Sequence, residues 1–195
     1  GRKVTKALNK EGYLTSETDA STGAAKNVEY LEDGTVKTTD AAGNVTIEQK
    51  DEWGNLTRRV DAEGNEWRYT FNQANKLTSI TYPNGRIDKY EYDGKGNLIK
   101  ETLAQGTSAQ IATTYSYDIY GQLTSMTSGG ATSAYTYDSA GNRTKITDAV
   151  GNVTTMGYDA AGNLTAITDP NGNTTAYAYD AIGNMTSVTD ASGNA

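Results

Sequence analysis

Tyrosine and aspartate recur side by side along this chain, and the repeated carboxylate is the group best suited to chemistry. The Tyr-Asp steps begin at Tyr92, Tyr117, Tyr137, Tyr158 and Tyr179, and a glycine follows each of them. Two carboxylates about 5 to 10 Å apart can act as a glycosidase pair. A row of carboxylates can instead bind calcium.

The residue inventory argues against catalysis. Histidine and cysteine are both absent from the 195 residues, which excludes disulfides, Cys/His zinc sites, cysteine nucleophiles and histidine acid–base pairs. The aspartates recur with the period of the turns, so any short distance between two of them follows from repetition and not from a built dyad. We therefore predict no catalytic residue, no cofactor and no metal site.

Calcium is the alternative use of these carboxylates. Stacked turn aspartates such as Asp148, Asp169 and Asp190 could form an acidic ladder. Their spacing matches neither an EF-hand loop nor the nonapeptide calcium repeat. Calcium dependence stays open at this point.

Composition and charge narrow the class of protein. The formal net charge of −7 disfavours nucleic acid and anionic membranes as partners, and no run of 18 apolar residues suggests membrane insertion. Of the 17 lysines and arginines, 15 lie in residues 1–100. The start, GRKVTKALNKEGYL, lacks the apolar segment of a signal peptide and does not begin with Met. We expect a piece of a longer chain.

Repetition organises the whole sequence. The Tyr-Asp steps are 20 to 25 residues apart, and weaker copies in phase extend the pattern toward the N-terminus. We predict one repeat array over residues 1–195, with units starting near residues 8, 30, 50, 71, 92, 117, 137, 158 and 179.

Each unit reads as a β-hairpin. Glycines fall 10 or 11 residues apart from Gly141 to Gly193, and a half-unit of that size holds one strand and one turn. In DAAGN, the Asp side chain can accept a backbone N–H two residues on, while Gly supplies a positive φ. The predicted structural positions are Tyr92, Asp93, Gly96, Tyr117, Asp118, Gly121, Tyr137, Asp138, Gly141, Tyr158, Asp159, Gly162, Tyr179, Asp180 and Gly183.

The strands carry apolar residues on alternate positions. Tyr177 and Tyr179 are two residues apart and share a face, so the tyrosine pairs of neighbouring units are expected to stack as an aromatic ladder. Leu164 and Ile167 are three apart. Either a bulge brings them to one face, or both faces are partly apolar.

Two local features do not follow from the regular spacing of strands and turns alone. A longer loop is expected near residues 101–113, either as an inert loop tip or as a binding loop. Sequons of the form N-x-T occur at Asn44, Asn55, Asn142, Asn152, Asn163, Asn173 and Asn184, where Asn follows the turn glycine and Thr suits the next strand. They are a consequence of the repeat, and their glycosylation would depend on the host.

The unit Y-x-Y-D-x-x-G-x-L-T, as in YSYDIYGQLT from Tyr115 to Thr124, resembles the YD repeat of the Rhs (rearrangement hotspot) family. That family includes bacterial polymorphic toxins, the C component of insecticidal toxin complexes and the teneurins. The resemblance implies an all-β fold of about nine tandem hairpins of 21 residues, forming a long antiparallel ribbon that curls into part of a hollow shell or spiral.

The resemblance also implies a structural role. We expect a wall segment of a secreted or cell-surface protein, whose partners are the rest of its own chain and an enclosed passenger, typically a C-terminal toxin. The alternatives are an adhesive array that binds a glycan or cell-surface receptor through its tyrosines, and a fibre that self-associates through exposed strand edges.

Overall fold

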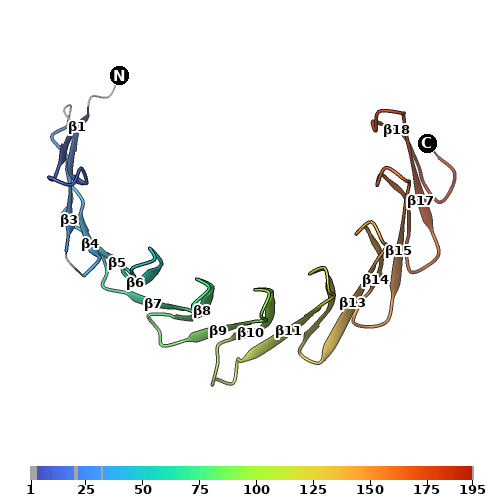
Figure 1. The fold of residues 1–195 in the computed structure, drawn as a ribbon, viewed down its shortest axis with the longest axis horizontal. Helices are drawn as coiled ribbons and strands as arrows, with labels where there is room; N and C mark the ends of the chain where they lie inside the picture. Colours follow the sequence, from blue (N-terminus) through green and yellow to red (C-terminus); the bar gives the residue numbers. More distant parts are fainter. Residues whose placement is uncertain (1–3, 20–21, 32, 195) are drawn as a thin grey trace. The chain divides into compact units, whose positions relative to one another are not determined.

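The computed structural model describes residues 4–19, 22–31 and 33–194, which form eighteen β-strands and no helix (Figure 1). The prediction of an all-β chain of consecutive antiparallel hairpins is confirmed. The first nine strands are β1 (Val4–Leu8), β2 (Leu14–Asp19), β3 (Ala25–Tyr30), β4 (Thr35–Thr39), β5 (Val45–Lys50), β6 (Leu56–Val60), β7 (Glu66–Phe71), β8 (Leu77–Thr81) and β9 (Ile87–Tyr92). The remaining strands are β10 (Leu98–Leu103), β11 (Ile111–Tyr117), β12 (Leu123–Ser128), β13 (Ala131–Tyr137), β14 (Arg143–Thr147), β15 (Val153–Tyr158), β16 (Leu164–Thr168), β17 (Thr174–Tyr179) and β18 (Met185–Thr189).

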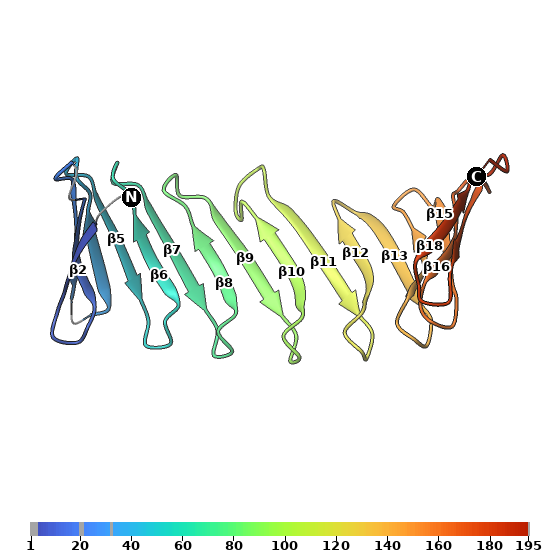
Figure 2. The same cartoon turned by 90° about the horizontal axis from the view of Figure 1, so that it is seen from above.

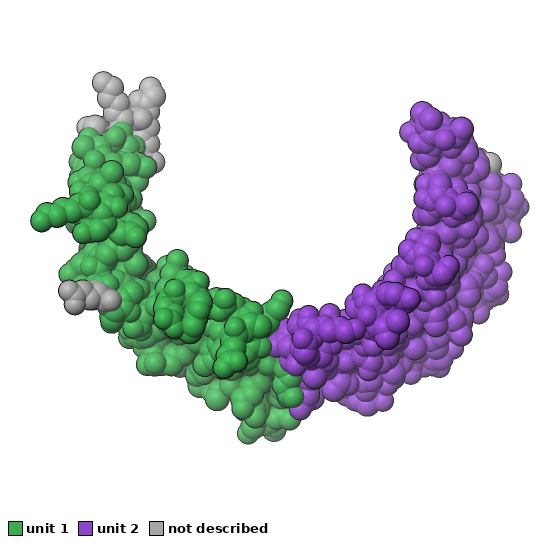
Figure 3. Space-filling view, viewed as in Figure 1, with its two compact units in different colours: residues 1–91, 102–110 green, residues 92–101, 111–195 purple. Residues whose placement is uncertain are grey.

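The chain divides into two compact units, shown in different colours in Figure 3. The first contains residues 1–91 and 102–110, and the second contains residues 92–101 and 111–195. Each unit is a sheet in which a strand pairs with the next strand along the chain, from β1 to β9 in the first and from β11 to β18 in the second. Turns therefore line both ends of the strands (Figure 2).

Within each unit the sheet is a single layer, so the chain has almost no conventional core. Val28, at 8% exposed, is the one buried apolar side chain among the described residues. Most tyrosines, leucines and isoleucines of the strands are half-buried against their neighbours in the same sheet. No helix in the part of the chain that the structure describes could cross a membrane.

A β-bulge settles how the apolar residues of a hairpin share one face. Tyr158 lies opposite Leu164, and Met156 lies opposite Ile167. Thr165 is thus the extra residue on β16, and it brings Leu164 and Ile167 to the face of Tyr158. The same shift recurs at the matching point of other hairpins, at Ala7/Leu8, Gln49/Lys50, Thr70/Phe71, Ser116/Tyr117, Thr136/Tyr137 and Ala178/Tyr179.

The bulge also explains why threonine follows leucine in the repeat. Thr57 and Thr124 occupy the bulge position, and their hydroxyls donate to the carbonyls of Gln49 and Ser116 at 3.1 Å. A carbonyl that leaves the regular ladder at the bulge is thereby paired. The sequon at Asn142, which follows a Tyr-Asp turn, shows the same contact, since the Thr144 hydroxyl donates to the Thr136 carbonyl at 3.3 Å.

The prediction that tyrosines of neighbouring repeats stack on one another is wrong. The even-numbered strand of each hairpin lies between successive tyrosine-bearing strands, so Tyr135 faces Ile146 and Tyr177 faces Val188. Among the described residues, the ring pair that comes together is Tyr13 with Tyr30, with centroids 5.2 Å apart. The apolar face is a row of alternating aromatic and aliphatic side chains.

Candidate functional site

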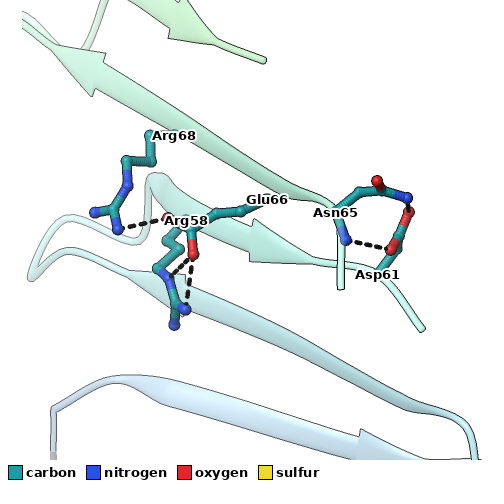
Figure 4. Close-up of polar contacts among 5 residues, drawn as sticks. All are labelled: Arg58, Asp61, Asn65, Glu66 and Arg68. Carbon is teal, nitrogen blue, oxygen red and sulfur yellow. Dashed lines mark hydrogen bonds and ion pairs between the residues drawn. The ribbon is translucent and has the colours of Figure 1, made fainter. Parts of the chain in front are cut away.

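The repeated element of this chain is a five-residue turn built around an aspartate, and the turn at Asp61 shows it (Figure 4). Asp61 Oδ1 accepts the backbone N–H groups of Glu63 at 3.0 Å and Asn65 at 2.9 Å. Asp61 Oδ2 accepts the side-chain amide of Asn65 at 2.8 Å. Gly64, at φ 84°, closes the turn by donating to the Asp61 carbonyl at 3.1 Å. The turn needs glycine here because this φ is strained for other L-residues.

The structure places the sequence-predicted repeat positions in this turn. Each Tyr ends the first strand of a hairpin, each Asp opens the turn, and each Gly is its fourth residue with positive φ. Eleven turns in the sequence have Asp first and Gly fourth. In ten of them the fifth residue is Asn, and its amide donates to the aspartate, at Asn44, Asn55, Asn65, Asn97, Asn142, Asn152, Asn163, Asn173, Asn184 and Asn194.

This geometry uses the carboxylates that a calcium ladder would need. Asp148, Asp169 and Asp190 each accept two backbone N–H groups on Oδ1 and an asparagine amide on Oδ2. In the residues that the structure describes, no group of three acidic side chains is arranged to hold a metal ion. Each aspartate instead serves its own turn.

The same hydrogen bonds make the turns sensitive to acid. The Asn184 amide and the backbone N–H groups of its turn lower the pKa of Asp180 below its ordinary value of 3.8, and Asp138 and Asp159 show the same shift from the same causes. A carboxylate with a lowered pKa in the folded state stabilises the fold above the unfolded-state pKa, and that contribution is lost as pH falls through the folded-state pKa.

We expect the melting temperature to change little between pH 7 and pH 5 and to fall steeply below about pH 4, because many turns protonate over one narrow range. Differential scanning fluorimetry across pH 2.5 to 7 measures this. Asp159→Asn is the matched variant, since an amide at this position does not titrate. A melting temperature that does not fall below pH 4 would contradict this account of the turns.

In four hairpins, the tyrosine just before the turn aspartate ties its hairpin to the preceding one. The hydroxyls of Tyr117, Tyr137 and Tyr179 donate to the carbonyls of Leu98, Leu123 and Leu164, each at 2.9 Å. Tyr158 donates to the Arg143 carbonyl at 3.1 Å. In each case the acceptor is the first residue of the preceding even strand. The tyrosine hydroxyl therefore has a structural partner at the strand end beside the turn.

One face of the first unit carries an ion-pair cluster (Figure 4). Glu66 on β7 lies between Arg58 on β6, whose Nε and guanidinium nitrogen lie 3.0 and 2.9 Å from Oε2, and Arg68, which pairs with Oε1. The Arg58 hydrogen bond is the main cause that lowers the pKa of Glu66. These side chains are about a third exposed or more, so we assign the cluster a modest contribution to stability.

A polar cluster in the first unit holds the base of the longer loop. Asp88 on β9, with a side chain only 2% exposed, accepts the Ala104 N–H at 2.9 Å and pairs with Arg86 at 2.8 Å. The Arg86 guanidinium also lies 4.1 Å from the centre of the Tyr82 ring. Burial opposes ionisation of Asp88, but the bonds from Ala104, Tyr82 and Arg86 keep its pKa below the ordinary value.

Sequence reasoning missed this cluster. In the turn YPNGR, Tyr82 occupies the place of the usual Asp, and Arg86 occupies the place of the usual Asn. These two changes from the usual turn sequence, together with an Asp two residues after the Arg, could have indicated an ion pair beside this turn. The loop itself covers residues 104–110, between β10 and β11, and Gln105 extends its anchor by donating to the Ile87 carbonyl at 2.8 Å.

Comparison with known proteins adds a family match and a shared fold. The family model described as RHS Repeat matches residues 51–87, 92–133, 121–153 and 158–195. The tRNA3(Ser)-specific nuclease WapA of Bacillus spizizenii is 34% identical over 177 residues, which covers 76% of this chain and 7% of that protein. The double-stranded DNA deaminase toxin A of Burkholderia cenocepacia is 26% identical over 137 residues, 61% of this chain and 10% of the toxin.

Two solved structures share the fold. The crystal structure of TcdB2-TccC3-TEV superposes with a TM-score of 0.67 at 17% identity, over 96% of this chain and 11% of that one. The Tc holotoxin pore of Photorhabdus luminescens gives a TM-score of 0.57 at 19% identity, over 95% of this chain and 12% of that one. The chain thus spans about a tenth of the length of the proteins that it matches.

Proposed function

Because this chain belongs to the RHS repeat family, we propose that it is a structural segment in the wall of a secreted or cell-surface protein that encloses a passenger, typically a toxin domain. The family match and the shared fold support a structural, toxin-associated role. The names of the relatives, a nuclease and a deaminase toxin, suggest the kind of passenger. In this proposal the chain holds the wall together and does no chemistry itself.

The observation that carries the proposal is the single-layer construction of each unit. In a compact domain, a sheet buries its apolar face against a second layer. Here each strand contacts its neighbours in sequence, and Val28 is the one buried apolar residue among those described. Because the hydrogen bonds join residues within a turn or on adjacent strands, the chain can be lengthened one hairpin at a time, as in other repeat proteins. Each added hairpin extends a sheet one layer thick, which is the construction that a wall needs.

Limited proteolysis of the full-length protein tests this function. If the repeats enclose a passenger, protease should spare a passenger segment in the native protein and degrade that segment once denaturant opens the turns. A passenger that is cut at the same rate in the native and opened protein would contradict enclosure. Uniform filaments of the native protein in negative-stain micrographs would favour assembly into a fibre, and saturable binding on a glycan array would favour adhesion.

A further inference from the structure

One turn of the second unit breaks the rule that the other ten follow. The turn DIYGQ, residues 118–122, has Gln in place of the fifth-position Asn. Asp118 Oδ1 accepts the N–H groups of Tyr120 at 2.8 Å and Gln122 at 2.9 Å, as in every other turn. The Gln122 amide, however, reaches the Gly141 carbonyl of the next Tyr-Asp turn at 3.3 Å. Among the described residues, no side chain donates to Asp118 Oδ2.

The Asp118 turn also borders a crevice of about 580 Å³ in the second unit. The crevice lies between the turns at residues 118–122 and 138–142 and is lined by Asp118, Tyr120, Gln122, Tyr135 and Tyr137 among others. Tyr120 is 81% exposed and contributes a free aromatic ring. The Tyr137 hydroxyl donates to the Leu123 carbonyl at 2.9 Å, and the turn at residues 138–142 contributes Asp138 and Ser139 to the lining. The turn at residues 118–122 offers the Asp118 and Gln122 oxygens and the Tyr120 ring.

The chemistry of this crevice is that of a cation site. Its lining residues include no lysine or arginine. The nearby Arg143 guanidinium lies 5.7 Å from the centre of the Tyr135 ring, and Lys95 donates to the Ile119 carbonyl at 2.8 Å. The second unit carries nine acidic against four basic residues, so its field attracts positive charge. A carboxylate oxygen without a partner, an amide oxygen and an aromatic face together suit an ammonium group.

We propose that the crevice between the turns at residues 118–122 and 138–142 binds a lysine side chain of a partner polypeptide. The ammonium group takes Asp118 Oδ2 and Gln122 Oε1 as acceptors, and the alkyl stem lies against the Tyr120 ring. The inference does not depend on enclosure of a passenger. It depends on one substitution in the repeat, which frees a carboxylate oxygen that the other turns cap.

Photo-crosslinking to the full-length protein tests the site. The probe is a short peptide that carries a diazirine and one lysine, and its matched control replaces lysine with norleucine. We expect saturable labelling of residues 115–141, mapped by mass spectrometry, at least tenfold stronger for the lysine peptide than for the norleucine peptide. Equal labelling by the two peptides, or no saturable labelling by the lysine peptide, would overturn the proposal.

The decisive variant is Gln122→Asn, which restores the usual turn and its amide cap on the aspartate. This variant should fold at least as well as the parent, yet its labelling should fall to the norleucine level. Asp180→Asn alters a turn outside the crevice, where Asn184 caps the carboxylate, and should leave labelling unchanged. Labelling that survives Gln122→Asn would rule out a cation site at Asp118. So would labelling that is displaced by methyl glucoside, a sugar competitor, but not by butylammonium, a cation competitor.

Discussion

Replacing Asp88 with alanine should destabilise the protein by about 2 to 3 kcal/mol, the cost expected when a buried carboxylate is removed and its hydrogen-bond donors are left unpaired. The change leaves the Ala104 N–H without its acceptor and Arg86 without its carboxylate. Because Ala104 is held at φ 50°, a strained value for a residue other than glycine, the loop should open when this anchor is lost. Denaturant unfolding, and hydrogen exchange of residues 104–110 in the full-length protein, measure the two effects.

Two variants separate the anchor from general damage to β9. Asp88→Asn keeps an acceptor for Ala104 but removes the charge, so its loss should be intermediate. Lys89→Ala, on the next residue and exposed to solvent, should change stability by less than about 0.5 kcal/mol. If Asp88→Ala left hydrogen exchange of the loop unchanged, the cluster would not be its anchor.

Gly34→Ala should cost about 3 kcal/mol, because it combines backbone strain with a steric clash. Gly34 has φ 79°, and a Cβ built there would lie 2.7 Å from the backbone carbonyl oxygen of Lys50. That oxygen belongs to the end of β5 and cannot rotate away as a side chain would. The Lys50 N–H also donates to the Gly34 carbonyl at 3.3 Å, so relief of the clash would break a second contact.

Gly43 is the matched control for this substitution. Its φ of 85° imposes the same strain, but no atom lies within 4 Å of a Cβ built there. Gly43→Ala should therefore cost only about 1 to 2 kcal/mol, the strain alone. Urea unfolding of the two variants gives the difference. Equal losses would mean that the close approach of Gly34 to Lys50 does not matter.

The hairpins and their turns were predictable because the information is local. Within a span such as Asp159 to Asn163, one carboxylate, one positive φ and one amide decide the backbone path, and the five residues are adjacent in sequence. The repetition of that span fixed the succession of strands. The all-β class and the family followed from the same letters.

The features that needed the structure depend on residues distant in sequence. The spacing of Leu164 and Ile167 allowed a bulge but did not require one, because its register is set by pairing with β15. The aromatic ladder failed because an aliphatic strand separates successive tyrosines. Asp88 and Ala104 are 16 residues apart, and no turn rule joins them. Likewise, that Gln122 reaches Gly141 and leaves Asp118 uncapped follows from how neighbouring turns pack.

Electron cryo-microscopy of the full-length protein tests the central claim most directly. If the chain is a wall segment, the map should show residues 4–194 within a continuous shell one sheet thick, with passenger density on the inner side. A map in which these hairpins project into solvent as a free array, with every other domain outside it, would contradict the account.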